Sequence, residues 1–215
     1  MLSQAEKGGV QNTIQNCVTV LQNDPVLADS IRLNLLSERI DIVKPMGWQR
    51  SGPTLTDTDM MYILRRMEKY GLYSEKRVSA AIRIVANENH YHPIRDYLND
   101  LKWDGTERIS HALHRFLGAA EDELTAEALK IFLLGAIKRV FHPGCKFEMM
   151  LCLVGGQGAG KSSFFRLLAI KDEWFSDDLR RMDDDNVFRK LQGHWIMEMS
   201  EMIATANAKS IEEIK

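Results

Sequence analysis

Residues 155–162 combine four glycines, a lysine and a serine at a spacing that suits phosphate binding. The stretch Gly-Gly-Gln-Gly-Ala-Gly-Lys-Ser matches the pattern G-x-x-x-x-G-K-[ST] without a mismatch. Glycines let backbone N–H groups turn inward, where a Cβ would block the phosphate. In this pattern Lys161 reaches the β- and γ-phosphates of a nucleotide, and the Ser162 hydroxyl binds Mg²⁺. The predicted binding residues are Gly156, Gln157, Gly158, Ala159, Gly160, Lys161, Ser162 and Ser163.

A second acidic site is expected about forty residues later in the chain. Residues 194–199 read His-Trp-Ile-Met-Glu-Met, an apolar run that ends in acid, and Ser200 and Glu201 follow. Glu198 would hold Mg²⁺ directly or through water, and Glu201 would orient the attacking water. Which glutamate has which role stays open, and an amphipathic strand with solvated ends is the alternative.

Short elements must position these side chains. The apolar run at 148–154 stops at glycine, which is typical of a strand buried on both faces. A helix should begin at Lys161, because Phe164, Phe165, Leu167 and Leu168 supply an apolar face. Two further strands are expected near 174–176 and over 195–199.

The region before the glycine-rich loop reads as mostly helical. Helices are expected over 13–23, from Asp24-Pro25, from Thr56 to Gly71, from Ser74, from Pro93, and over 107–117 and 125–141, with a small hairpin within 31–43 that turns at Ser37-Glu38. The division falls near His142-Pro143-Gly144. The sequence thus predicts an α/β protein with a mainly helical region over 1–143 and a P-loop core over 144–215.

Composition limits the function classes. The chain has 215 residues, of which 45% are apolar and 27% charged, as in ordinary soluble proteins. No stretch approaches the ~20 apolar residues of a membrane span, so no membrane partner is expected. Three scattered cysteines suit a reducing cytoplasm. The net charge of −2 argues against a general electrostatic attraction to nucleic acid, so any contact with nucleic acid must be local.

One local candidate for DNA contact lies around Gly71. A helix, a tight turn at this glycine and a second helix bearing Lys76, Arg77 and Arg83 would suit a helix-turn-helix that reads DNA. Two packed helices with a solvated basic edge explain the same pattern, because Glu75 and Glu88 alternate with those bases.

Four stretches carry a family resemblance: HPIRDYLNDLKWDGTERI (92–109), FHPGCKFEMMLCLVGGQGAGKSSFFRLLA (141–169), EWFSDDL (173–179) and LQGHWIMEMSEM (191–202). Together they resemble the virulence-associated E family of phages, prophages and pathogenicity islands. The resemblance covers roughly residues 55–215. It implies an AAA-type P-loop ATPase related to the superfamily 3 replicative helicases of mobile elements. ATP, Mg²⁺, DNA and assembly into a homo-oligomeric ring are implied with it.

The same resemblance assigns the phosphate-contacting lysine to Lys161, the metal-binding serine to Ser162 and the strand-end acids to Glu198 and Glu201. It also implies a polar sensor residue and an intersubunit arginine that would follow the printed end, SIEEIK. A further strand between the phosphate-loop strand and the acid-bearing strand would likewise follow Lys215. We therefore expect a segment of a longer replication protein, which alone binds nucleotide weakly, if at all, and does not hydrolyse it.

Three functions are compatible with these residues. The first is the motor of an ATP-dependent DNA helicase. The second is a DNA-binding replication initiator whose helical region does the work and whose nucleotide site only regulates. The third is a small-molecule kinase, which would be expected to carry acceptor-binding and lid elements after the second acidic strand, and no such elements can be read there.

Overall fold

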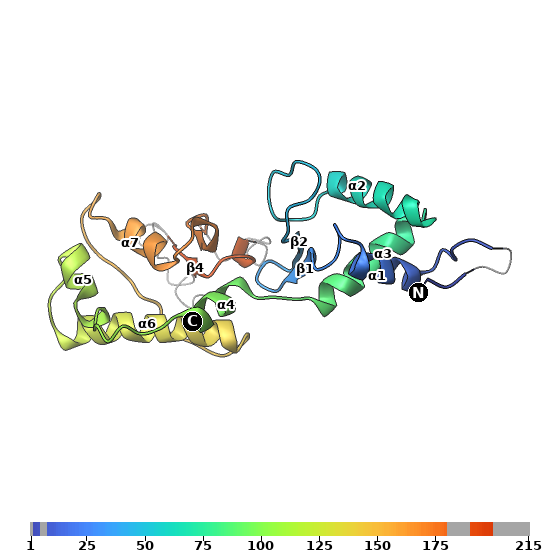
Figure 1. Cartoon of the computed structure of the whole chain (residues 1–215). Helices are drawn as coiled ribbons and strands as arrows, with labels where there is room; N and C mark the ends of the chain where they lie inside the picture. The colour runs from blue at the N-terminus through green and yellow to red at the C-terminus, as the bar shows by residue number, and fades with distance from the viewer. Residues whose placement is uncertain (1, 5–7, 180–189, 200–215) are drawn as a thin grey trace. The chain divides into compact units, whose positions relative to one another are not determined.

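The computed structural model describes residues 2–4, 8–179 and 190–199, and these residues form both helices and strands (Figure 1). The expected mixed α/β class is confirmed. No helix within these ranges combines the length and the apolar character needed to cross a bilayer.

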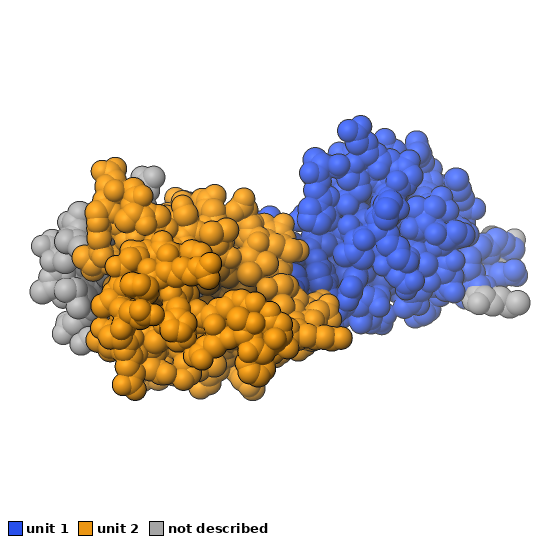
Figure 2. All heavy atoms as spheres, turned by 60° about the vertical axis from the view of Figure 1, so that its left-hand side comes forward, with its two compact units in different colours: residues 1–93 blue, residues 94–215 orange. Residues whose placement is uncertain are grey.

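The chain divides into two compact units, unit 1 over residues 1–93 and unit 2 over residues 94–215 (Figure 2). We expected the division near residue 143. The expected boundary between a mainly helical region and a P-loop core stays a prediction, while helices between residues 94 and 141 share an apolar core with the segment that carries the glycine-rich loop. Unit 1 has a separate core of its own.

Unit 1 follows the local signals of its sequence closely. Its described elements are α1 (Ile14–Asn23), β1 (Ile31–Asn34), β2 (Arg39–Ile42), α2 (Asp57–Met67), the 3₁₀ helix η1 (Glu68–Tyr70) and α3 (Glu75–Glu88). Thr13 caps α1 by accepting the Asn16 N–H, and Thr56 forms a capping box with Asp59 at the start of α2. Gly71, with φ at +74°, ends the helical run as expected.

The predicted hairpin is present, and one predicted helix is not. β1 and β2 pair antiparallel with Ile31 opposite Ile42, and Glu38 in the connecting turn has φ at +54°. The short helix expected from Asp24-Pro25 is wrong. Residues 25–30 form hydrogen-bonded turns instead. Asp24 Oδ1 accepts the N–H groups of Val26 and Leu27 as an N-cap does, but Asp29, with φ at +55°, has a left-handed conformation that ends the helical turn.

Unit 2 carries the candidate site. Its described elements are α4 (Pro93–Asp100, beginning at the boundary), α5 (Ile109–Leu117), α6 (Glu123–Phe141), α7 (Lys161–Leu168), the 3₁₀ helix η2 (Asp172–Trp174), β3 (Phe175–Ser176) and β4 (Ile196–Met197). α5 and α6 pack against each other, and Phe164 of α7 is buried with Leu113 of α5 and Leu129 of α6. α4 and α7 begin at the expected residues, and α5 and α6 lie within two residues of their expected bounds, whereas η2 was not predicted.

The strand predicted over 148–154 is wrong for the described structure. This segment joins no ladder with any described residue, although Leu151 and Leu153 do pack against the core formed by α5, α6 and α7. A strand exists only where its backbone N–H and C=O groups find partners on a neighbouring strand. The apolar run therefore supplies side chains to the core without forming a sheet with the described residues.

The other two strands are present but short. β3 and β4 pair in parallel, with Phe175 opposite Ile196, and the pairing is extended by the bonds from Trp195 N–H to Trp174 C=O and from Glu198 N–H to Ser176 C=O. Trp195 Nε1 also donates to the Ala136 carbonyl at 3.2 Å, which ties β4 to α6. These contacts fix the backbone that carries Glu198.

Candidate functional site

The glycine-rich loop has the backbone shape that its sequence requires. Gly158 and Gly160 have φ values of +80° and +83°, a region that side chains with a Cβ rarely adopt. A Cβ placed on Gly155, Gly156 or Gly158 would meet no described atom within 4 Å. The loop is therefore open above these glycines, and residues 154–160 are all exposed.

Helix α7 begins directly at the end of this loop. Gly160 is its N-cap and offers no side chain, and the Phe164 N–H bonds to the Gly160 carbonyl at 2.9 Å. The N–H groups of the first turn have no intrahelical acceptor, and the helix dipole makes this end positive. A loop of exposed amides leading into a helix start is suited to binding an anion such as phosphate.

Lys161 lies over the loop. Its Nζ donates to the carbonyl oxygens of Gly155 at 2.9 Å and Gly156 at 2.8 Å. Both acceptors are neutral carbonyls at an exposed site, and a phosphate oxygen would form a stronger, charge-assisted bond with the same ammonium group. The lysine is thus held where an anion bound to the loop would meet it.

The structure brings Ser162 and Glu198 together. Ser162 Oγ, at the start of α7, donates to Glu198 Oε1, just after β4, at 2.7 Å. The other carboxylate oxygen, Glu198 Oε2, is buried and has no hydrogen-bond partner among the described residues. A buried acceptor without a partner is costly, and a cation or a water at this position would satisfy it.

These two residues fit a magnesium ion. Mg²⁺ prefers oxygen ligands and uses one or two carboxylates together with water and substrate phosphates. Across the described residues, no group of three or more His, Cys, Asp or Glu side chains could hold a metal alone. A hydroxyl and a carboxylate beside an anion-binding loop are what a phosphate-bound Mg²⁺ requires.

The remaining predicted residues fall into two groups. Gln157, Ala159 and Ser163 are exposed in the loop and the first turn of α7, and the Ala159 N–H bonds to the Gly156 carbonyl at 3.4 Å. Glu201 lies outside the described residues, so its predicted role stays a prediction.

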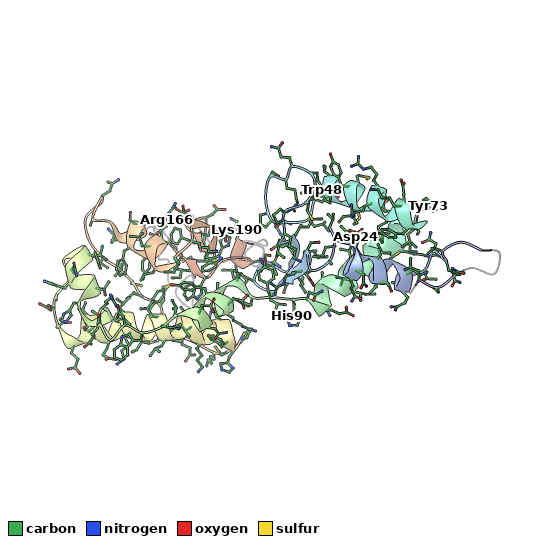
Figure 3. All side chains as sticks on the ribbon, viewed as in Figure 1. Asp24, Trp48, Tyr73, His90, Arg166 and Lys190 are labelled. Carbon is green, nitrogen blue, oxygen red and sulfur yellow. The ribbon has the colours of Figure 1, made fainter. Side chains whose placement is uncertain are left out.

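Sequence reasoning missed the contacts that hold α7 in place. The Arg166 guanidinium, labelled in Figure 3, lies 5.1 Å from the ring centroid of Phe175 in β3 and 3.5 Å from the Asp177 carboxylate. At the other end of the helix, a Cβ on Gly160 would lie 3.9 Å from Leu117 Cδ2 of α5. No motif or spacing marks these contacts, because they join residues that only the tertiary fold brings together.

The helix-turn-helix expectation in unit 1 gains no specific support. Lys76, Arg77 and Arg83 are exposed on α3, but the Arg77 guanidinium donates to the Asn12 carbonyl. α3 packs mainly on α1 and β1, and its contacts with α2 are few. DNA contact by this helix stays a prediction.

The described site belongs to a mixed α/β protein in which a glycine-rich loop starts a helix and a strand-end glutamate faces the serine of that helix. The family model of the virulence-associated protein E-like domain matches residues 98–215, which is more than half of the chain. The chain therefore belongs to the virulence-associated protein E-like family, and the resemblance predicted from its sequence is confirmed. No curated protein matches the chain.

Proposed function

We propose that this chain contributes the Mg²⁺-ATP site of a helicase-type ATPase that serves the replication of a phage or another mobile element. The observation that carries the proposal is the 2.7 Å hydrogen bond between Ser162 and Glu198 beside the open glycine-rich loop. The loop pattern alone predicts phosphate binding. The nearby carboxylate with an unsatisfied oxygen adds the metal-binding half of the site.

Each residue has a defined task in this proposal. The amides of the loop and of the first turn of α7 bind phosphate oxygens, and Lys161 offsets the negative charge of the terminal phosphates. Ser162 and Glu198 would hold Mg²⁺, and the bound ion would supply positive charge that stabilises the charge of the transition state. Glu201 orients the attacking water. DNA and assembly into a homo-oligomeric ring belong to the same proposal.

Nucleotide binding by the purified chain tests the site. Lys161→Ala should weaken Mg·ATP binding by roughly 10- to 100-fold in titration calorimetry, because hydrogen bonds to charged groups contribute about 1.5–3 kcal/mol. Lys130→Ala is the matched control, since Lys130 is exposed on α6 and pairs only with Glu127 among the described ion pairs. Equal affinities for the wild type and Lys161→Ala would refute the phosphate-binding role.

A second function has the same site in a regulatory role, within a DNA-binding replication initiator. The exposed basic side chains of α3, Lys76, Arg77 and Arg83, are the feature that favours the initiator. The two functions differ in how DNA affects ATP turnover. Measurement in the protein as it occurs in its host decides between them: stimulation of phosphate release by single-stranded DNA favours the motor, and indifference favours the initiator.

A further inference from the structure

An exposed aromatic residue is the sequence neighbour of a leucine that packs beside Gly160 of the phosphate-binding loop. Phe116, in the last turn of α5, is 66% exposed. Its sequence neighbour Leu117 packs into the core with Phe164, and Leu117 Cδ2 would lie 3.9 Å from a Cβ placed on Gly160. Because consecutive Cα atoms lie ~3.8 Å apart, the backbone of Phe116 is held next to the loop that α7 follows.

The end of α5 is fixed rather than loose. Gly118, with φ at +67°, donates to the His114 carbonyl at 2.9 Å, and His114 Nδ1 lies 2.8 Å from the Ala119 carbonyl oxygen. His111 Nδ1 lies 3.0 Å from Glu121 Oε1 in the following turn. These contacts hold the backbone at Phe116 in one arrangement, which reduces the entropy lost when a ligand binds.

The chemistry around Phe116 suits a flat aromatic ligand. The Arg115 guanidinium lies 5.7 Å from the centroid of the Phe116 ring, within the range of a cation–π contact. An aromatic ring beside an arginine, with most of its surface open, is the kind of surface on which nucleobases stack. Stacking does not depend on the hydrogen-bonding edge of a base.

We propose that Phe116, supported by Arg115, is the base-stacking platform for a nucleotide whose phosphates occupy the 155–162 loop. This inference rests on the proposed nucleotide site and adds the part that binds the nucleoside. Since the contact is stacking, it raises the affinity for adenine and guanine nucleotides alike and gives no selectivity between them.

The test compares ATP, GTP and inorganic tripolyphosphate, each with Mg²⁺, by titration calorimetry on the 215-residue chain. Phe116→Ala should lose about fivefold to 100-fold in affinity for both nucleotides, the range that base–aromatic stacking provides. Its affinity for tripolyphosphate should not change, because that ligand has no base. Phe116→Trp should bind both nucleotides at least as well as the wild type.

Leu134→Ala is the matched control, because Leu134 is an exposed apolar residue of α6 at 56% exposure. If Phe116→Ala unfolds, Phe116→Leu keeps the apolar bulk and removes only the aromatic ring. Equal losses for ATP and tripolyphosphate would show that Phe116 merely supports the loop. Unchanged nucleotide affinity in Phe116→Ala would overturn the platform. Absence of binding of both nucleotides and tripolyphosphate, measured in the wild-type protein as it occurs in its host, would instead refute the nucleotide site itself.

Discussion

Two carboxylates of the chain show how a structural acid differs from a candidate ligand. Asp59 is buried in unit 1, and Trp48 (labelled in Figure 3), Arg50 and Thr56 donate to its oxygens at 2.8–3.1 Å. Burial alone would raise the pKa of Asp59, but the hydrogen bonds outweigh it and hold that pKa well below its usual range. Both oxygens of Asp59 are satisfied. Glu198 differs because one of its buried oxygens has no partner among the described residues.

This contrast leads to a prediction for Glu198. Glu198→Gln keeps a carbonyl that can accept from Ser162 but removes the negative charge that a cation requires. We expect the Mg²⁺ concentration needed for ATP binding to rise by about 10- to 100-fold, the usual effect of losing a group that holds a metal. Binding of ATP without metal should be unchanged.

Two other variants serve as comparisons for the Mg²⁺ requirement of Glu198→Gln. Glu173→Gln removes an exposed acid that lies 3.9 Å from Lys171, and it should leave the Mg²⁺ requirement as it is. In the protein as it occurs in its host, Glu201→Gln should keep Mg·ATP binding and slow phosphate release, because a group that orients water acts mainly in the transition state. A raised Mg²⁺ requirement in Glu201→Gln, with none in Glu198→Gln, would exchange the two roles.

At the scale of elements, the sequence signals that predicted correctly are those that depend only on neighbouring residues. Thr13, Thr56 and Gly71 mark helix ends because caps and left-handed stops depend on neighbouring residues only. The hairpin turn near Glu38 is local in the same way. The 148–154 run failed as a strand because pairing depends on a distant partner, which no apolar pattern reveals.

The residues of the candidate site also differ in whether local sequence or tertiary packing reveals them. The loop, Lys161 and Ser162 form one contiguous motif and could be identified from spacing. Glu198 could be proposed from its place after an apolar run, but its contact with Ser162 is set by the pairing of β3 with β4. Phe116 had no sequence signal, since the contact of its neighbour Leu117 with Gly160 follows from the packing of α5 on α7.

A close approach between α6 and the segment before the loop gives a prediction at this scale. A Cβ on Gly135 would lie 2.2–2.5 Å from three atoms of the Phe147 ring. In an exposed helix, glycine to alanine stabilises by roughly 0.5–1 kcal/mol. Here Gly135→Ala should instead destabilise unit 2, because overpacking costs roughly 1–3 kcal/mol.

The control is a double-mutant cycle measured by urea unfolding. With Phe147→Ala in the background, the clash is gone, and Gly135→Ala should become neutral or stabilising. The sign of its effect thus reverses between the two backgrounds. A destabilisation of equal size in both would mean that Phe147 does not pack on Gly135.

At the scale of the whole molecule, the chain consists of two units with separate cores. The core of unit 1 joins α1, α2, α3 and the hairpin, and it includes Leu21, Ile63 and Ile82. Arg66 and Tyr70 add a buried network by donating to Asp24, the residue that follows α1, at 2.5 Å and 2.6 Å. The core around Leu113, Leu129 and Phe164 belongs to unit 2 alone and forms the base on which the loop and α7 are built.

This division predicts how ligand binding distributes its stabilisation. A ligand that binds only the folded state stabilises it by about 2.7 kcal/mol at a concentration one hundred times its Kd. All residues proposed to bind the nucleotide lie in unit 2, so Mg·ATP should slow amide hydrogen exchange in α5, α6 and α7. The slowest amides of α1 and α3 should exchange at the same rate with and without Mg·ATP, because the core of unit 1 can open without that of unit 2. Lys161→Ala, measured at the same nucleotide concentration, should lose most of the protection in unit 2. Equal protection of both units in the wild type would show that they unfold as one cooperative body, and the separation into independent cores would then fail as an account of stability.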